Sequence, residues 1–232
     1  MTIKTGIIIL CRYNSSRLPG KILKKINGKE ILLYIIERIK KINPRLEFIV
    51  ATSEEISDEP IIQFCSEHNI KFFRGSLNNV ADRFLQCALQ YNLDFAFRIN
   101  GDNLLLDIDL LKNCLDIAQT NQFDFISNVD NRTFPKGMSV EAIRTEIYKK
   151  EIENFSEYDK EHVMTYFYRN IQNFKHHFLY NHEIPELAGY QIAVDTQDDL
   201  ELMHKIILEF TNDHTQYGLK EIFQILKKLD KI

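Results

Sequence analysis

The sequence contains no apolar run long enough to cross a membrane. Its longest apolar runs, such as 31-ILLYII-36, fall far short of the roughly 20 residues that a spanning helix requires. Near the N-terminus, the run 6–10 is too short for the apolar region of a signal peptide, and Arg12 comes immediately after it and Cys11. We therefore expect no membrane partner and a cytoplasmic location.

Paired cysteines are missing as well. The four cysteines, Cys11, Cys65, Cys87 and Cys114, are widely scattered along the chain. This spacing argues against a zinc site and against a disulfide framework, and it suits a reducing compartment such as the cytoplasm.

The chain also lacks an excess of positive charge. Its net charge is −4 and its pI is about 6.0, so it has no general attraction for nucleic acid and we expect no such partner. Any anion must then be bound by a local basic cluster, and one follows the first apolar run. From Cys11 to Lys29 there are six basic residues and no carboxylate. The six are Arg12, Arg17, Lys21, Lys24, Lys25 and Lys29.

The loop 11-CRYNSSRLPGK-21 has the features of a phosphate-binding loop. Turns at Pro19 and Gly20 would let backbone amides approach a ligand, and arginine and lysine donate well to phosphate oxygens. The loop is not a Walker P-loop, because Ser15 replaces the first glycine and Ile22 follows the lysine; the three-glycine dinucleotide fingerprint is missing too. The alternative is a solvated basic loop, which we favour for the lysines after residue 21. We favour binding of a nucleotide triphosphate for Arg12, Arg17 and Lys21.

Short apolar runs alternate with amphipathic segments, which predicts a βαβα order in one α/β domain of residues 1–232. We predict strands at 4–10, 46–52, 70–74, 94–99, 124–128, 138–143, 175–180 and 190–194. We predict helices at 30–41, 58–68, 78–91, 107–120, 144–153, 157–172, 197–210 and 217–230. The sheet should be mostly parallel with helices on both faces. Residues 129–188 interrupt the alternation and are expected to form an insertion or flap on the core.

Carboxylates lie at the ends of two predicted strands. Asp102, in 98-RINGDN-103, follows the strand 94–99, and Asp195 follows the strand 190–194. The carboxyl ends of parallel strands meet at one edge of the sheet, which also receives the loop 11–21. If the two strands are neighbours, the carboxylates could hold one or two Mg²⁺ ions against a phosphate; capping of a turn is the alternative for Asp102. We expect four other acids to be helix-capping or first-turn residues, namely Asp107, Asp109, Asp198 and Asp199.

Together these segments resemble bacterial cytidylyltransferases of the spore coat polysaccharide biosynthesis type, relatives of the synthetases of CMP-ketodeoxyoctonate and CMP-sialic acid. The family pattern reads approximately A-R-x-x-S-x-R-L-P-G-K, and residues 11–21 match it with Cys11 in place of alanine. Further matches follow in the family's order over nearly the whole chain. They are 51-ATS-53, 74-RGS-76, 82-DRF-84, 98-RINGDN-103, 135-PKG-137 with Val140 and Glu141, 161-EHV-163 and 194-VDTQDDLE-201.

The resemblance implies a nucleotide-diphospho-sugar transferase fold of the glycosyltransferase-A type, with CTP as the donor and Mg²⁺ held by Asp102 and Asp195. It places Arg12, Ser15, Arg17 and Lys21 at the triphosphate. It places Leu10, Cys11, Arg74 and Asn100 near the cytosine. For the small-molecule acceptor it suggests Glu161, His162, Arg132, Lys136 and Glu141, all within the insertion 129–188. The related synthetases are commonly dimers, so we also expect a homodimer.

The reaction we expect is attack of a sugar or sugar-acid hydroxyl on the α-phosphorus of CTP, with release of pyrophosphate. Positioning and charge neutralisation drive such transfers, and Arg12, Arg17, Lys21, Asp102 and Asp195 would supply them. Three alternatives remain open: a nucleotidyltransferase for another nucleotide or a non-sugar acceptor, a non-catalytic nucleotide-binding protein, and a glycosyltransferase. The sequence does not identify the acceptor.

Overall fold

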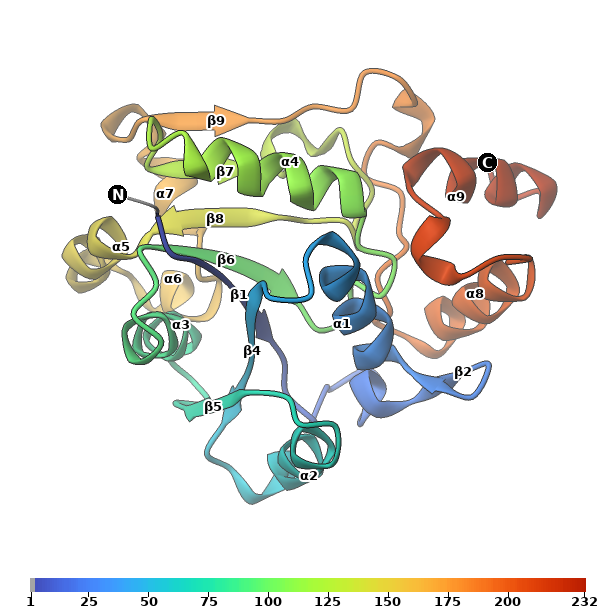
Figure 1. The fold of residues 1–232 in the computed structure, drawn as a ribbon, viewed down its shortest axis with the longest axis horizontal. Coiled ribbons are helices and arrows are strands. Elements are labelled where there is room, and N and C mark those ends of the chain that lie inside the picture. Colours follow the sequence, from blue (N-terminus) through green and yellow to red (C-terminus); the bar gives the residue numbers. More distant parts are fainter. Residues whose placement is uncertain (1–2) are drawn as a thin grey trace.

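The computed structural model describes residues 3–232 and contains a seven-stranded central sheet (Figure 1). Its strands are β1 (Thr5–Leu10), β4 (Glu47–Ser53), β5 (Phe72–Gly75), β6 (Phe95–Asn100), β7 (Phe125–Ser127), β8 (Glu141–Arg144) and β9 (His176–Phe178). They lie in the order β5-β4-β1-β6-β8-β7-β9. β8 is antiparallel to both of its neighbours, and the other pairs are parallel. The mostly parallel sheet predicted from the sequence is therefore confirmed.

Helices cover both faces of this sheet, as predicted. They are α1 (Ile31–Ile42), α2 (Glu59–Glu67), α3 (Val80–Gln90), α4 (Ile108–Gln119), α5 (Thr145–Glu151), α6 (Glu157–Glu161), α7 (Thr165–Arg169), α8 (Gln197–Leu208) and α9 (Leu219–Lys228). A small hairpin is formed by β2 (Lys25–Ile26) and β3 (Lys29–Glu30). Short 3₁₀ helices lie at Lys21–Leu23, Ile56–Asp58, Asp130–Arg132, Ile152–Asn154, Ile171–Asn173, Pro185–Leu187 and His214–Gln216.

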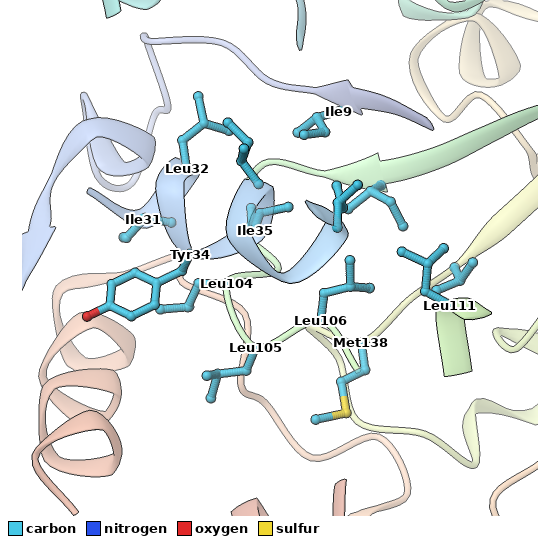
Figure 2. Close-up of a cluster of buried hydrophobic side chains, with 14 of the residues drawn as sticks. Ile9, Ile31, Leu32, Tyr34, Ile35, Leu104, Leu105, Leu106, Leu111 and Met138 are labelled. Carbon is cyan, nitrogen blue, oxygen red and sulfur yellow. The ribbon is translucent and has the colours of Figure 1, made fainter. Parts of the chain in front are cut away.

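The two-residue repeat of a strand divides the core into two layers. In β1, Ile7 and Ile9 point into a cluster with α1, α2, α4, α8 and α9, part of which Figure 2 shows. Ile8 and Leu10 point to the opposite face, where they pack with α3, α5 and α7. Every one of these four side chains is buried, which is why the strand reads as a continuous apolar run.

The order of the strands opens a crevice between β1 and β6. From β1 the chain continues through α1 to β4 and through α2 to β5, moving away in one direction. It then crosses back through α3 to β6, which lies on the other side of β1, and continues away from it. Adjacent strands whose following loops diverge leave room for a ligand beyond their carboxyl ends. The loops after residues 10 and 100 border this crevice.

Two predicted elements differ from the structure. The predicted helix 157–172 is broken into α6 and α7, because the buried carboxylate of Asp159 accepts hydrogen bonds from Ser156 on one side and from Thr165 and Arg169 on the other. The predicted strand 190–194 is wrong. This segment is extended and buried at Ile192 and Val194, but it makes one isolated bridge, between Lys136 and Gln191, in place of a ladder.

The segment 129–188 contributes two strands to the sheet itself. β8 lies between β6 and β7, and β9 forms the edge beside β7. The role expected for this segment in acceptor binding and dimerisation remains a prediction. None of the helices described in residues 3–232 has the length and apolar character needed to span a membrane. The four cysteines are free and buried.

A buried arginine joins the C-terminal part of the chain to α1. Arg38 is fully buried and donates to the carbonyl oxygens of Leu106 (3.0 Å), Tyr217 (3.0 Å) and His214 (2.6 Å). Burial lowers the pKa of Arg38 to about 10, so its side chain is still charged at neutral pH. One side chain thus satisfies backbone oxygens from the segment before α4 and from the segment before α9.

Replacing Arg38 should destabilise the fold. Arg38→Met keeps much of the apolar volume but leaves buried carbonyl oxygens without a donor, so we expect the free energy of unfolding to fall by about 3 kcal/mol. Urea denaturation measures this change. The control is Lys40→Met at an exposed position of the same helix, which should shift it by less than about 0.5 kcal/mol. Equal stability of Arg38→Met and wild type would contradict the assigned role.

Candidate active site

A cavity of about 340 Å³ opens at the carboxyl edge of the sheet, in the crevice between β1 and β6. It brings together most of the residues that the sequence predicted. Those that line it are Leu10, Cys11, Arg12, Ser15, Arg17, Lys21, Asn100, Asp102, Glu161, His162 and Asp195. They come from the loop after β1, the end of β6, the end of α6 and the turn before α8.

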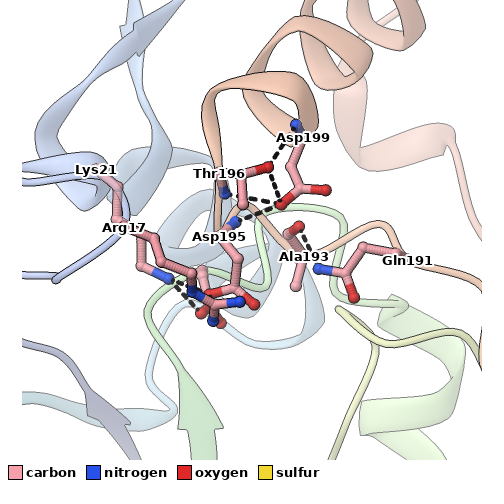
Figure 3. A network of polar contacts seen from close by, with 8 residues as sticks. Arg17, Lys21, Gln191, Ala193, Asp195, Thr196 and Asp199 are labelled. Carbon is pink, nitrogen blue, oxygen red and sulfur yellow. Dashed lines mark hydrogen bonds and ion pairs between the residues drawn. The ribbon is translucent and has the colours of Figure 1, made fainter.

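Lys21 lies at the centre of this site. Its Nζ is 2.7 Å from Oδ2 of Asp102 and 2.8 Å from Oδ1 of Asp195. Nη2 of Arg17 is 3.1 Å from the same oxygen of Asp195 (Figure 3). Lys21 is only 9% exposed, whereas the side chain of Arg17 is largely exposed. Two carboxylates from distant parts of the chain are therefore joined through one ammonium group.

The charges of this cluster stabilise one another. Burial lowers the pKa of Lys21, but Asp102 and Asp195 outweigh this effect and raise the pKa above its ordinary value. Burial raises the pKa of Asp195, and the contacts with Lys21 and Arg17 outweigh it, so this pKa is lowered. Lys21 and Asp195 are therefore both ionised at neutral pH.

A third carboxylate, Asp58, holds the start of the loop 11–21. Its Oδ1 accepts a hydrogen bond from the backbone N–H of Tyr13 at 2.7 Å. Its Oδ2 accepts from the hydroxyls of Thr52 (2.7 Å) and Ser53 (2.6 Å) and from the Ser53 N–H (2.9 Å). Gly20 closes the loop with a φ of 68° and an N–H bond to the carbonyl of Tyr13 at 2.8 Å. The loop is thus fixed at both ends before any ligand binds.

The loop after β6 packs directly against the loop after β1. The N–H of Gly101 donates to the carbonyl of Leu10 at 2.9 Å. A Cβ at position 101 would lie 2.7 Å from Cβ of Cys11, closer than two such atoms approach, so glycine is required there. This contact fixes Asp102 relative to Lys21.

Asp195 is positioned by the N-terminus of α8. The carboxylate of Asp199 accepts from the N–H groups of Asp195 (3.0 Å) and Thr196 (2.8 Å). In return, the Thr196 hydroxyl oxygen accepts from the N–H of Asp199 (3.2 Å), as Figure 3 shows. The structural role predicted for Asp199 is confirmed. Asp107 likewise caps α4, as predicted, by accepting from the N–H of Leu110 at 2.8 Å.

Four residues expected at the site lie outside the cavity. Arg74 donates to the carbonyl oxygens of Ser53 and Glu54 and pairs with Glu59. Three others have local partners. Glu141 is buried and pairs with Arg98, Arg132 donates to the Ser139 hydroxyl at 3.0 Å, and the backbone of Lys136 bonds to that of Tyr190 and Ile192. The structure therefore does not bring these four together with the cluster around Lys21.

Two arginines that the site prediction missed do line the cavity, Arg83 of α3 and Arg98 of β6. Arg98 pairs with Glu141, and that carboxylate accepts a second bond from the Tyr168 hydroxyl at 2.8 Å. Spacing provides a signal for Arg98, because it lies two residues before Asn100 on one strand and so faces the same side of the sheet. Arg83 lies in 82-DRF-84, a segment that matches the family pattern but for which no role was predicted.

The donor set suits a divalent cation such as Mg²⁺. Within residues 3–232, no group of three or more His, Cys, Asp or Glu side chains is arranged to hold a metal ion. The carboxylates of Asp102 and Asp195 nevertheless converge on one cation, the Lys21 ammonium. Magnesium prefers few protein carboxylates together with phosphate and water oxygens, and these two residues meet that requirement.

Removing the loop anchor Asp58 should weaken the fold in a pH-dependent way. Burial raises the pKa of Asp58, but the hydrogen bonds from Ser53 and Thr52 outweigh it, so the folded pKa is lowered. The carboxylate then stabilises the fold above its unfolded pKa of about 3.9, and this stabilisation is lost as the pH falls through the folded pKa. We expect Asp58→Asn to lower the free energy of unfolding by about 2 kcal/mol at neutral pH, because an amide cannot accept all four bonds.

Urea denaturation at about pH 7 and at about pH 3 measures this difference, which should shrink in acid. The exposed Asp116→Asn of α4 is the control and should change little at either pH. A loss of stability that is equal at both pH values would exclude the ionised carboxylate as its cause.

Comparison with known proteins agrees with this geometry. A family model described as cytidylyltransferase matches residues 6–230. An uncharacterized protein of Methanocaldococcus jannaschii is 32% identical over 226 residues, which cover 97% of this chain and 91% of that protein. The spore coat polysaccharide biosynthesis protein SpsF of Bacillus subtilis is 24% identical over 229 residues, or 95% and 93% of the two chains.

The solved structure of a cytidylyltransferase from Leptospira borgpetersenii superposes with a TM-score of 0.90 at 28% identity, covering 98% of this chain and 95% of that one. This likeness confirms the predicted nucleotide-diphospho-sugar transferase fold. Since the family model covers almost all of residues 3–232, the chain belongs to the cytidylyltransferase family and is a nucleotidyltransferase.

Proposed function

We propose that the protein is a Mg²⁺-dependent enzyme that transfers CMP from CTP to a hydroxyl of a sugar or sugar acid and releases pyrophosphate, in surface polysaccharide or glycan biosynthesis. The observation that carries this proposal is the bridge from Lys21 to Asp102 and Asp195, set in an open cavity beside Arg12 and Arg17. Family membership supports CTP as the donor. The role in glycan synthesis follows from the name of the similar Bacillus subtilis protein.

The roles of the basic residues follow from their places in the cavity. Phosphoryl transfer of this kind requires little covalent chemistry from the protein, and charge neutralisation with in-line positioning supplies most of the catalysis. Lys21, Arg12 and Arg17 would stabilise the charge that develops on the departing pyrophosphate. Leu10, Cys11 and Asn100 line the same cavity and would contact the nucleoside.

Asp102 and Asp195 are the residues that would hold Mg²⁺. Bound with a nucleotide, the ion would neutralise phosphate charge and polarise the α-phosphate. Lys21 lies between the same carboxylates and keeps them from repelling each other in the free enzyme.

The acceptor would enter from the side of α6. Glu161 and His162 are exposed and line the cavity, so both can contact a bound sugar. Arg98 offers guanidinium donors on the same side, and its charge is balanced by Glu141. A cytoplasmic location belongs to the proposal as well, because CTP is a cytoplasmic metabolite. Homodimerisation also belongs to it, and rests on the resemblance to the related synthetases.

Removing the central ammonium tests the catalytic assignment. Lys21→Met should lower the turnover number about 10²–10³-fold, because one preorganised electrostatic contact to the departing pyrophosphate is lost. The measurement is pyrophosphate release from CTP and Mg²⁺ with a panel of sugars and sugar acids, repeated with UTP, ATP and GTP to establish the donor. Lys25→Met, on the exposed side of the β2–β3 hairpin, is the matched control and should keep wild-type turnover. Near wild-type activity of Lys21→Met would refute the assignment.

A further inference from the structure

The basic side chains of the cavity differ in how their charges are balanced. Five line it: Arg12, Arg17, Lys21, Arg83 and Arg98. Arg17 and Lys21 pair with Asp195, Lys21 also pairs with Asp102, and Arg98 pairs with Glu141. Among residues 3–232, neither Arg12 nor Arg83 has a carboxylate within 4.0 Å. These two arginines carry charge that the protein itself does not neutralise.

Arg83 is the more unusual of the two because it is buried. The residue is 3% exposed and projects from the first half of α3. Its Nη1 donates to the carbonyl of Ser76 at 3.1 Å, while its buried Nε has no partner in the described part of the chain. Burial lowers the pKa of Arg83, and the negative charge of Asp58 offsets part of this effect from a distance. The carboxylate oxygens of Asp58 already accept hydrogen bonds from Tyr13, Thr52 and Ser53. A buried guanidinium without an ion pair is costly, and an anionic ligand would remove that cost.

The position of Arg83 indicates which ligand this is. It lines the cavity together with Arg12, whose charge is near enough to lower the pKa of Arg83 in addition to burial. Two cations that line one cavity and have no carboxylate within 4.0 Å in the described part of the chain favour an oxyanion over a neutral base or sugar. Lys21 and Arg17, in contrast, are already paired with Asp102 and Asp195.

We propose that Arg83, together with Arg12, binds a phosphate group of the donor nucleotide and is a further substrate-binding residue of this enzyme. The assignment rests on the proposed function for the identity of the anion. It differs from the role expected for Arg74, which the resemblance places near the cytosine and whose guanidinium bonds to backbone carbonyls and Glu59 outside the cavity.

Titration calorimetry on Arg83→Met and Arg83→Lys tests the proposal, with CTP, UTP and inorganic tripolyphosphate as ligands. A hydrogen bond between charged partners accounts for roughly a 10- to 100-fold change in affinity. We expect Arg83→Met to weaken binding of CTP and of tripolyphosphate by about that factor, to leave the preference for CTP over UTP unchanged, and Arg83→Lys to recover part of the loss. Arg144→Met, outside the cavity on β8, is the control and should bind like wild type.

Two results would overturn the proposal. If the preference for CTP over UTP collapses while tripolyphosphate binding is kept, Arg83 contacts the base. If all affinities stay at wild-type values, Arg83 has a structural role or serves the acceptor. Thermal unfolding of each variant separates lost binding from lost folding.

A double-mutant cycle keeps the proposal testable if Arg83→Met folds poorly. Arg12→Met and Arg83→Lys, singly and combined, should show non-additive losses of tripolyphosphate affinity, because both side chains contact one anion. Additive losses would contradict a shared phosphate. Failure of the proposed function has a different signature: wild type would bind tripolyphosphate through Arg83 yet release no pyrophosphate from CTP with any acceptor.

Discussion

The bridge from the Lys21 ammonium to Asp102 and Asp195 is the interaction on which the site depends. The partners lie 81 and 174 positions further along the chain, so the bridge joins a loop, a strand end and a helix entry. A largely buried ammonium requires carboxylate partners, and two carboxylates this close repel each other unless a cation lies between them. The ammonium therefore stabilises both carboxylates in the free site, and each carboxylate stabilises the ammonium. The cavity is organised before a substrate enters it.

The sheet makes this bridge possible. β1 and β6 are neighbours and their following loops diverge, so Lys21 and Asp102 face the same crevice. Close packing of Gly101 on Cys11 leaves no room for a side chain at position 101, which fixes the distance between the loops. Asp195 arrives by another route, at the end of an extended segment whose Val194 N–H bonds to the carbonyl of Asp102 at 3.3 Å. The extended segment 190–194 thus places Asp195 at the site although it is not a regular strand.

The sequence predicted those features that depend on local pattern. Buried strands such as 5–10 and amphipathic helices such as 31–42 follow from apolar periodicity, and the loop 11–21 and Asp102 follow from their places at strand ends. Features decided by distant partners escaped prediction. The interruption between α6 and α7 at residues 162–164 depends on hydrogen bonds from Thr165 and Arg169 to the carboxylate of Asp159. The guanidinium of Arg74 lies outside the cavity because it donates hydrogen bonds to the carbonyl oxygens of Ser53 and Glu54. No sequence pattern predicts these bonds.

The balance of charge around Lys21 bears on the order of binding. Arg17 and Lys21 supply two positive charges against the two negative charges of Asp102 and Asp195, so this part of the cavity is neutral before a ligand arrives. A divalent cation that entered alone would meet carboxylates already paired with basic side chains. Under the proposed function, a cation that entered with a triphosphate would reach freed carboxylates, because phosphate oxygens would compete for Lys21 and Arg17. In that case the ion pairs that organise the free site would also couple the affinity for metal to the affinity for nucleotide.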